Sequence, residues 1–176
     1  MLSLRTRSGQ ECSSLKSSRH VRWFICMKNL DEKYMRIALN EAQKAEAIDE
    51  VPVGAVIVKD GKIIARGHNL REKSNDPTAH AEIVAIRKAC KKLKSWRLEG
   101  CTIYVTIEPC SMCAGTLLWT RIQRIVYGAN DIKGGALGSS YNLFEVKNIN
   151  HKVEITRGVL ENRCAALITS FFRSKR

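Results

Sequence analysis

Four side chains in two short segments have the types and the spacing of a catalytic metal site. His80 and Glu82 flank a single alanine, and Cys110 and Cys113 stand three positions apart. Imidazole and thiolate are ligands that Zn²⁺ prefers, and three protein ligands leave a fourth tetrahedral position for water, as in catalytic zinc sites. Bound zinc lowers the pKa of water to about 7, which favours hydrolysis at neutral pH. The spacing therefore predicts that His80, Cys110 and Cys113 hold one zinc ion.

Glu82 has a separate role in this interpretation, because it stands two residues from His80 and is not one of the ligands. A carboxylate beside an activated water can accept a proton and pass it to the departing group. The pattern H-x-E followed by P-C-x-x-C is typical of zinc deaminases, in which this glutamate is the acid and base. We therefore predict that Glu82 is the catalytic residue.

A closed structural zinc site is the alternative, with Cys90 or Cys101 as the fourth ligand. Closed sites usually contain two paired knuckles and need no carboxylate beside a ligand. This chain has one C-x-x-C pair, and Glu82 stands beside the histidine. The catalytic interpretation is favoured for that reason.

Two helices must bring the ligands together. One is expected to start near His80, because Ile83, Ile86 and Leu93 fall on one face at the spacing of an amphipathic helix. The other is expected over residues 110–119. The first N–H groups of a helix have no partner within it and favour thiolates over thiols. If the two N-terminal ends converge, the three ligands meet.

The rest of the chain alternates between strands and helices. A helix over residues 31–47 should end before Pro52, and Asp60-Gly61 between two β-branched runs predicts a hairpin. Strands are expected over residues 53–59, 62–67, 101–107, 122–127 and 153–156, and a last helix over 162–172. This order favours an α/β fold in which helices cover both faces of a five-stranded mixed sheet, with parallel pairing where a helix joins two strands.

Length and charge indicate one domain with an anionic partner. The 176 residues include 30 basic and 17 acidic side chains, for a formal charge of +13, and chains of this length usually form a single domain. Nucleic acid is the first candidate for the partner. The alternative is that part of the charge only keeps the surface soluble.

Residues 1–26 differ from the rest, with five basic residues and one acid among many serines. They lack the periodicity of a packed element. We expect a disordered basic extension ahead of a deaminase domain at residues 27–176. It could be a transit peptide, an RNA-binding arm, or residues upstream of a true start at Met27. Without this extension the net charge is still +9 (13 − 4).

Cysteine use and hydropathy predict the location of the protein. Seven cysteines, an odd number, without a signal-peptide pattern favour free thiols in a reducing compartment. No apolar run approaches the roughly 18 residues that span a bilayer. We expect a cytoplasmic protein without a membrane segment, or an organellar one if residues 1–26 are a transit peptide.

Further segments extend the two motifs into a family resemblance. With them, residues 31–173 resemble the bacterial tRNA-specific adenosine deaminases, within the cytidine-deaminase-like superfamily. The segments that carry the resemblance are residues 51–55, 76–82, 108–115 and 134–139. One departure is residues 116–120, which include Trp119, where related enzymes have a smaller and more polar segment.

The resemblance implies a three-layer α/β/α sandwich and a homodimer with one Zn²⁺ per subunit. It also implies hydrolysis of adenosine to inosine at the wobble position of a tRNA anticodon, in an arginine tRNA. Asn69 would hydrogen-bond the flipped base, and Asp131 would lie beside the RNA backbone. The structural alternatives are a turn residue after a strand for Asn69 and the cap of a helix or turn for Asp131.

Two other functions compete with this interpretation. One is deamination of free guanine, cytosine or a nucleotide on the same fold, and the other is an RNA-binding module whose metal only stabilises the fold. The high basicity favours RNA, because a small substrate needs no large positive surface. Candidate phosphate contacts are Lys91, Lys92, Lys94, Arg97, Arg173, Lys175 and Arg176.

Overall fold

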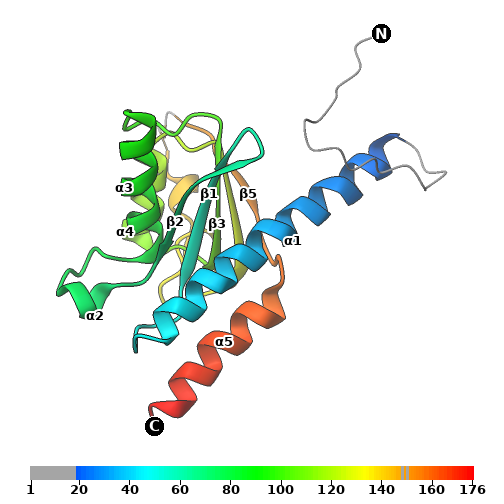
Figure 1. The fold of residues 1–176 in the computed structure, drawn as a ribbon. Helices are drawn as coiled ribbons and strands as arrows, with labels where there is room; N and C mark the ends of the chain where they lie inside the picture. Colours follow the sequence, from blue (N-terminus) through cyan, green and yellow to red (C-terminus); the bar gives the residue numbers. More distant parts are fainter. Residues whose placement is uncertain (1–18, 148, 150) are drawn as a thin grey trace. The chain divides into compact units, whose positions relative to one another are not determined.

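The centre of the fold is a five-stranded sheet with strand order β2-β1-β3-β4-β5 (Figure 1). The computed structural model describes residues 19–147, 149 and 151–176, and Asp31–Arg176 form the compact unit that contains the sheet. The strands are β1 (Gly54–Lys59), β2 (Lys62–His68), β3 (Cys101–Ile107), β4 (Arg124–Ala129) and β5 (Glu154–Thr156). All five expected strands are confirmed to within two residues at each end.

The sheet is mixed, as expected. The β1–β2 hairpin turns at Asp60 and Gly61, which both have positive φ, the conformation that a tight two-residue hairpin needs. β1 pairs with β3 in antiparallel register, whereas β3, β4 and β5 are parallel to one another. The helix between β3 and β4 provides the crossover that parallel neighbours require.

Four of the helices correspond to predicted ones, and two short elements were not predicted. The helices are α1 (Arg19–Glu46), α2 (Arg71–Ser74), α3 (Ala81–Leu93), α4 (Ser111–Trp119) and α5 (Glu161–Ser174), with a 3₁₀ turn over Leu143–Glu145. α1 begins at Arg19 and not at residue 31. Residues 1–18 of the predicted extension lie outside the described residues. None of the described helices is long and apolar enough to cross a bilayer.

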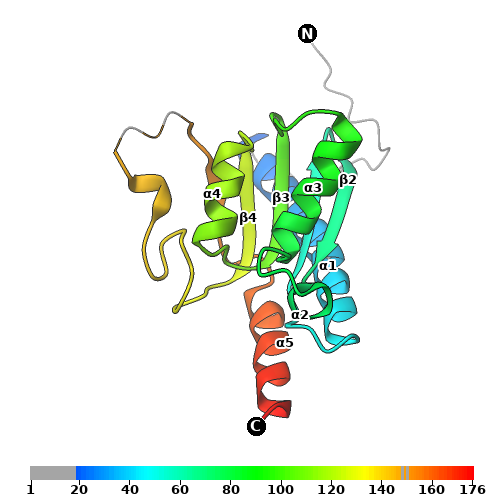
Figure 2. The same cartoon turned by 90° about the vertical axis from the view of Figure 1, so that its left-hand side faces the viewer.

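The helices form layers on both faces of the sheet, which confirms the α/β/α sandwich. α3 and α4 pack on one face, where Ile83 and Leu117 join strand residues such as Ile103 in a buried core (Figure 2). On the opposite face, Met35 of α1 and Cys164 of α5 belong to the second core cluster. Each face of the sheet therefore buries its own apolar layer.

Gly67 in β2 allows α3 to pack closely against the sheet. A Cβ atom at this position would lie 2.4 Å from the backbone oxygen of Ala81 and 2.7 Å from the backbone nitrogen of Ala85. Backbone atoms cannot move aside as a flexible side chain can, so only glycine permits this approach. The first turn of α3, which follows His80, is thereby held against the sheet.

Candidate metal centre and substrate pocket

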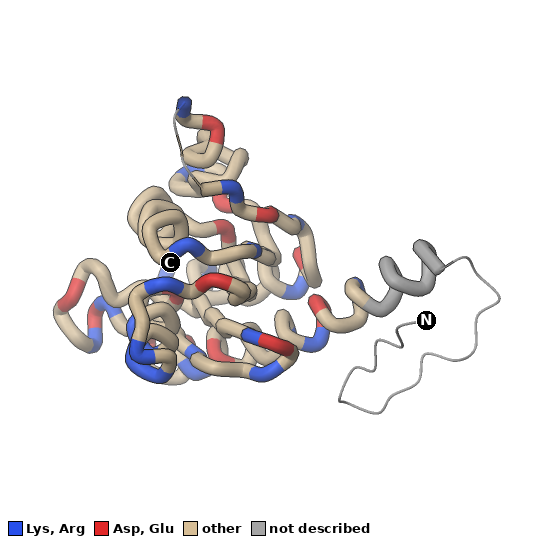
Figure 3. Tube along the Cα trace, turned by 90° about the horizontal axis from the view of Figure 1, so that it is seen from above, with Lys and Arg blue, Asp and Glu red and all other residues tan. Residues whose placement is uncertain are grey.

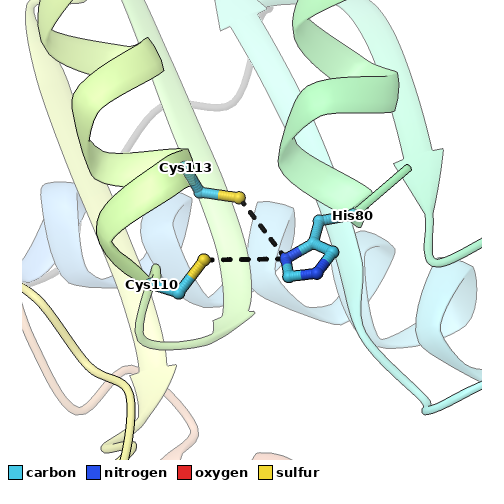
Figure 4. Close-up of side chains that lie close together, drawn as sticks. All are labelled: His80, Cys110 and Cys113. Atoms are coloured by element: carbon cyan, nitrogen blue, oxygen red, sulfur yellow. Dashed lines mark hydrogen bonds between the residues drawn. The ribbon is translucent and has the colours of Figure 1, made fainter. Parts of the chain in front are cut away.

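The N-terminal ends of α3 and α4 converge and bring the three predicted ligands together (Figure 4). His80 and Cys110 are the N-cap residues of the two helices, and neither side chain caps its helix. The His80 Nδ1 atom lies 3.7 Å from the sulfur atoms of both Cys110 and Cys113. All three donor atoms lie within 4.8 Å of one another. A single metal ion can therefore contact all three.

No fourth His, Cys, Asp or Glu joins this group among the residues that the structure describes. The sulfur of Cys90 faces the backbone oxygen of Trp96, and the sulfur of Cys101 faces that of Glu99. Neither cysteine completes a closed shell. The donor set of one nitrogen and two sulfurs thus matches a zinc site with an open position better than a structural site.

The pKa values of the Cys110 and Cys113 thiols are shifted in opposite directions. The pKa of Cys110 falls to about 4, mainly because the Cys113 thiol donates a hydrogen bond to it and also because His80 lies beside it. The pKa of Cys113 is raised by the same hydrogen bond and by burial. Hydrogen bonding to Cys110 also raises the pKa of His80. A divalent cation can replace these protons, because metal binding requires deprotonated sulfur and neutral imidazole.

Glu82 lies in the first turn of α3 beside this group but is not part of it. Its side chain is only 3% exposed and hydrogen-bonds with Cys113. Burial raises the pKa of Glu82 to about 7. A carboxyl group that titrates near neutral pH can both accept and release a proton, as acid–base catalysis requires.

A cavity of about 810 Å³ opens over His80, Cys110 and Glu82. It lies at the edge of the sheet where the parallel strands β3 and β4 end, the usual ligand site of such sheets. The loop after β4 contributes Asp131, and the last turns of α5 contribute Ile168 and Phe172. The volume is that of a typical small-molecule pocket.

Asn69 lies directly after β2, is buried and forms part of the cavity wall. Its Nδ2 atom donates a hydrogen bond of 3.0 Å to Glu50. The other carboxylate oxygen of Glu50 accepts the backbone N–H of Lys73 at 2.7 Å. Glu50 is 1% exposed and fixes the orientation of the Asn69 amide. Sequence reasoning missed Glu50, because no motif includes it.

Asp131 lines the cavity and also caps its own turn. Its Oδ1 atom accepts the backbone N–H groups of Lys133 and Gly134, which is the structural alternative raised for this residue. Its own N–H donates to Glu108, a second buried carboxylate that the sequence did not single out. Glu108 also accepts the N–H groups of Leu137 and Ser139, so the glycine-rich loop is anchored beside the site.

Six of the seven predicted phosphate contacts divide into two sets, and the seventh, Arg173 on α5, does not line the cavity. Lys175 and Arg176 line the cavity, together with Arg71 and Lys133, which the sequence did not single out. Lys91, Lys92, Lys94 and Arg97 instead lie at the far end of α3 and just beyond it. Both sets are basic, but only the first lines the pocket.

Comparison with known proteins agrees with this geometry. The profile of the MafB19-like deaminase family matches residues 29–176. A tRNA-specific adenosine deaminase of Bacillus subtilis is 51% identical over 146 residues, which cover 83% of this chain and 91% of that protein. The chain belongs to the tRNA-specific adenosine deaminase family. The resemblance expected from the motifs is confirmed.

Solved structures give the same family assignment. One comes from a study of A-to-I editing by tRNA:A34 deaminases at the wobble position, with 44% identity and a TM-score of 0.73 over 77% of this chain and 98% of that one. A guanine deaminase from Nitrosomonas europaea is more distant, with 26% identity and a TM-score of 0.67 over 80% and 83% of the two chains. Members of the tRNA-specific adenosine deaminase family thus share their fold with an enzyme for a free base.

Proposed function

We propose that this protein deaminates adenosine to inosine at the wobble position of a tRNA anticodon, in a zinc-dependent hydrolysis. The observation that carries the proposal is the buried Glu82 beside a three-donor His and Cys group at the base of a pocket. Membership of the tRNA-specific adenosine deaminase family supports the choice of substrate.

His80, Cys110 and Cys113 would hold the zinc ion, one in each subunit. Their donor atoms are of the kinds that Zn²⁺ prefers, and no other acidic, histidine or cysteine side chain among the described residues closes the group. When bound there, zinc supplies a Lewis acid that makes a water molecule acidic enough to lose its proton at neutral pH.

Glu82 would move the protons of the reaction. Its carboxylate accepts the proton of the water that attacks C6 of adenine and delivers it to N1. It then takes the proton of the new C6 hydroxyl group and passes it to the exocyclic amine, so that the C6–N6 bond breaks and ammonia leaves inosine behind. Because burial keeps the pKa of Glu82 near neutrality, one carboxyl group can perform both transfers.

Asn69 and Asp131 would bind the substrate. Glu50 accepts one N–H of the Asn69 amide, so the rest of that amide is available to hydrogen-bond the flipped base. Asp131 lies across the cavity on the loop after β4, where its carboxylate can accept a hydrogen bond from a ribose 2′-hydroxyl. The cations that line the pocket would contact phosphates.

Glu50 should act through Asn69, which makes Glu50→Gln a test of how the base is held. Glu50 uses one carboxylate oxygen for Asn69 and the other for Lys73. A glutamine side chain has only one acceptor oxygen, beside a donor nitrogen, so it cannot make both hydrogen bonds, and the Asn69 amide loses its orientation. We expect KM to rise about tenfold, equivalent to about 1.4 kcal/mol, with a smaller change in kcat. Steady-state kinetics on an anticodon stem-loop measures both.

Glu46→Gln is the matched control, because it removes the same charge four residues away on α1. It should leave KM unchanged. A Glu50→Gln protein with normal melting temperature and normal KM would show that Glu50 does not orient the base-binding amide.

We further propose a homodimer that acts on an arginine tRNA, in the bacterial cytoplasm, where reduced thiols remain available to zinc. The family resemblance supports the choice of tRNA. On α4, Trp119 is 73% exposed, and a large exposed aromatic side chain is typical of an interface between subunits. Light scattering on the purified protein tests the dimer, since a mass near 19.8 kDa would contradict it.

Deamination of free guanine is the second candidate, because the Nitrosomonas europaea guanine deaminase shares the fold. The cavity lining weighs against it, since it includes Arg71, Lys133, Lys175 and Arg176. A neutral free base needs no such group of cations, whereas an RNA loop brings phosphates to it.

The deciding experiment compares substrates directly. The purified zinc-loaded protein is incubated with an anticodon stem-loop that contains a wobble adenosine, and separately with free adenosine, guanine and cytosine. We expect inosine in the digested RNA by mass spectrometry and no ammonia from the free compounds. Turnover of a free base alone, with unmodified RNA, would reject the proposed function in favour of the second candidate.

A further inference from the structure

The outer side of α3 is uniformly basic. Its exposed side chains are Arg87, Lys88, Lys91 and Lys92, while its only acid, Glu82, is buried in the pocket. The next residue after the helix, Lys94, is also exposed. A solvated helix usually mixes charges of both signs, because like charges one turn apart destabilise it. The presence of five cations on this side of the helix and directly after it favours a role in binding an anion.

The basic side continues onto the neighbouring edge of the sheet. β2 is an edge strand, and its exposed Arg66 stands beside α3, because the Lys88 ammonium donates a hydrogen bond to the Arg66 backbone oxygen. Two acids pair with these cations in exposed salt bridges, Asp76 with Arg87 and Glu99 with Arg97. The α3 surface consists of Arg66, Arg87, Lys88, Lys91, Lys92, Lys94, Trp96 and Arg97. Its cations outnumber these paired acids by more than three to one.

Trp96 lies at the far end of the α3 surface and is 59% exposed. The Arg97 guanidinium lies 4.9 Å from the centroid of its ring. Solubility alone does not explain an indole held among cations in water. An exposed aromatic ring beside basic side chains is the arrangement on which unpaired bases stack in proteins that bind single-stranded nucleic acid. This favours RNA over an acidic protein or a lipid headgroup.

α3 connects the pocket with the α3 surface. α3 begins directly after the ligand His80 and ends at Leu93, so its 13 residues span about 20 Å. Phosphates of one strand succeed one another every 3.4 Å or so along the axis of a duplex, so a basic helix side can contact several of them at once. Figure 2 shows α3 running along the sheet from the end nearer α2 toward the opposite end, and Figure 3 shows blue Lys and Arg positions at several places along the chain.

We infer that the α3 surface is a second RNA-binding site, which holds the phosphate backbone of the substrate outside the catalytic pocket and stacks a base on Trp96. The inference rests on the proposed function for the identity of the RNA. The surface supplies affinity, whereas the pocket selects and deaminates the base.

Charge reversal along the helix tests the phosphate contacts. The variant Lys91→Glu/Lys92→Glu/Lys94→Glu should raise KM and Kd for the complete tRNA at least tenfold, with kcat within a factor of two of the unchanged protein. The slope of log Kd against log salt concentration should become shallower by about two to three, because about one counterion is released for each phosphate contact. Trp96→Ala should raise Kd about fivefold, and Trp96→Phe should retain most of the affinity.

The matched control is Lys147→Glu/Lys152→Glu/Arg163→Glu, which changes the net charge equally at exposed positions outside the α3 surface. It should shift Kd less than threefold. Equal shifts in both triple variants would mean that only net charge matters, and no shift in the α3 variant would mean that the surface binds something other than this RNA. Either result overturns the inference. An unchanged Kd in the Trp96→Ala variant would show that no base stacks on Trp96. Absence of deamination by the unchanged protein would instead reject the proposed function, because Kd is measured without turnover.

Discussion

Replacing Glu82 by glutamine should lower kcat for deamination of the stem-loop by about three orders of magnitude, in the range that a general acid–base contributes. The amide fills the space of the carboxyl group in this buried position but can neither accept the proton of water nor return it to the purine. KM should change little, because substrate affinity depends on other residues of the pocket. Single-turnover assays of inosine formation measure the loss.

Metal content distinguishes this role from a structural one. Glu82→Gln protein should still contain about one zinc ion per subunit by elemental analysis, because Glu82 is not part of the donor group. Its melting temperature should stay within about 3 °C of that of Glu46→Gln, which serves as the control for a Glu-to-Gln change. Zinc-loaded Glu82→Gln protein with normal kcat would contradict the proton-transfer role.

The metal centre and the sheet could be predicted from the sequence because their determinants are local. His80 and Cys110 each precede a helix by one residue, so the motifs specify both the ligand types and the helix ends that position them. The strands follow from β-branched runs and from the Asp60-Gly61 turn, whose effect extends over only a few residues.

The buried carboxylates that support the site could not be predicted in the same way. Glu50 binds Asn69 and Lys73, which are 19 and 23 residues away, and Glu108 binds N–H groups up to 31 residues away. A glutamate in a sequence carries no sign that it will be buried. Only the folded chain shows that these two acids accept backbone and amide hydrogens on either side of the pocket.

Asp31 shows how a local signal can mislead. An aspartate ahead of an apolar periodic segment is typical of a helix start, and the pattern predicts that the first helix begins at residue 31. The helix instead begins at Arg19, and both carboxylate oxygens of Asp31 accept hydrogen bonds from Arg124, 93 residues away. The segment before it contains no proline or glycine from residue 19 onward, so nothing in the chain stops the helix there.

Removal of the metal should abolish deamination and lower stability together. In the free protein, the ends of α3 and α4 hold two sulfurs and an imidazole within 4.8 Å of one another, with hydrogen bonds among them. Zinc binds the folded arrangement and not the unfolded chain, so it stabilises the fold by mass action, by about 4 kcal/mol at a free concentration of 1,000 times Kd. We expect dialysis against a chelator to eliminate inosine formation, to lower the melting temperature by several degrees, and to leave the circular dichroism spectrum at 25 °C nearly unchanged.

Restoring one equivalent of zinc should recover both activity and melting temperature. A metal that only stabilised an RNA-binding module would restore the melting temperature without any catalysis. Cys110→Ser should fail to recover either, because a hydroxyl group does not deprotonate as readily as the Cys110 thiol, whose pKa is about 4. Cys90→Ser is the matched control, since Cys90 lies outside the donor group and its sulfur faces a backbone oxygen. Full activity in the chelated protein, or in Cys110→Ser protein without zinc, would exclude this metal centre from the reaction.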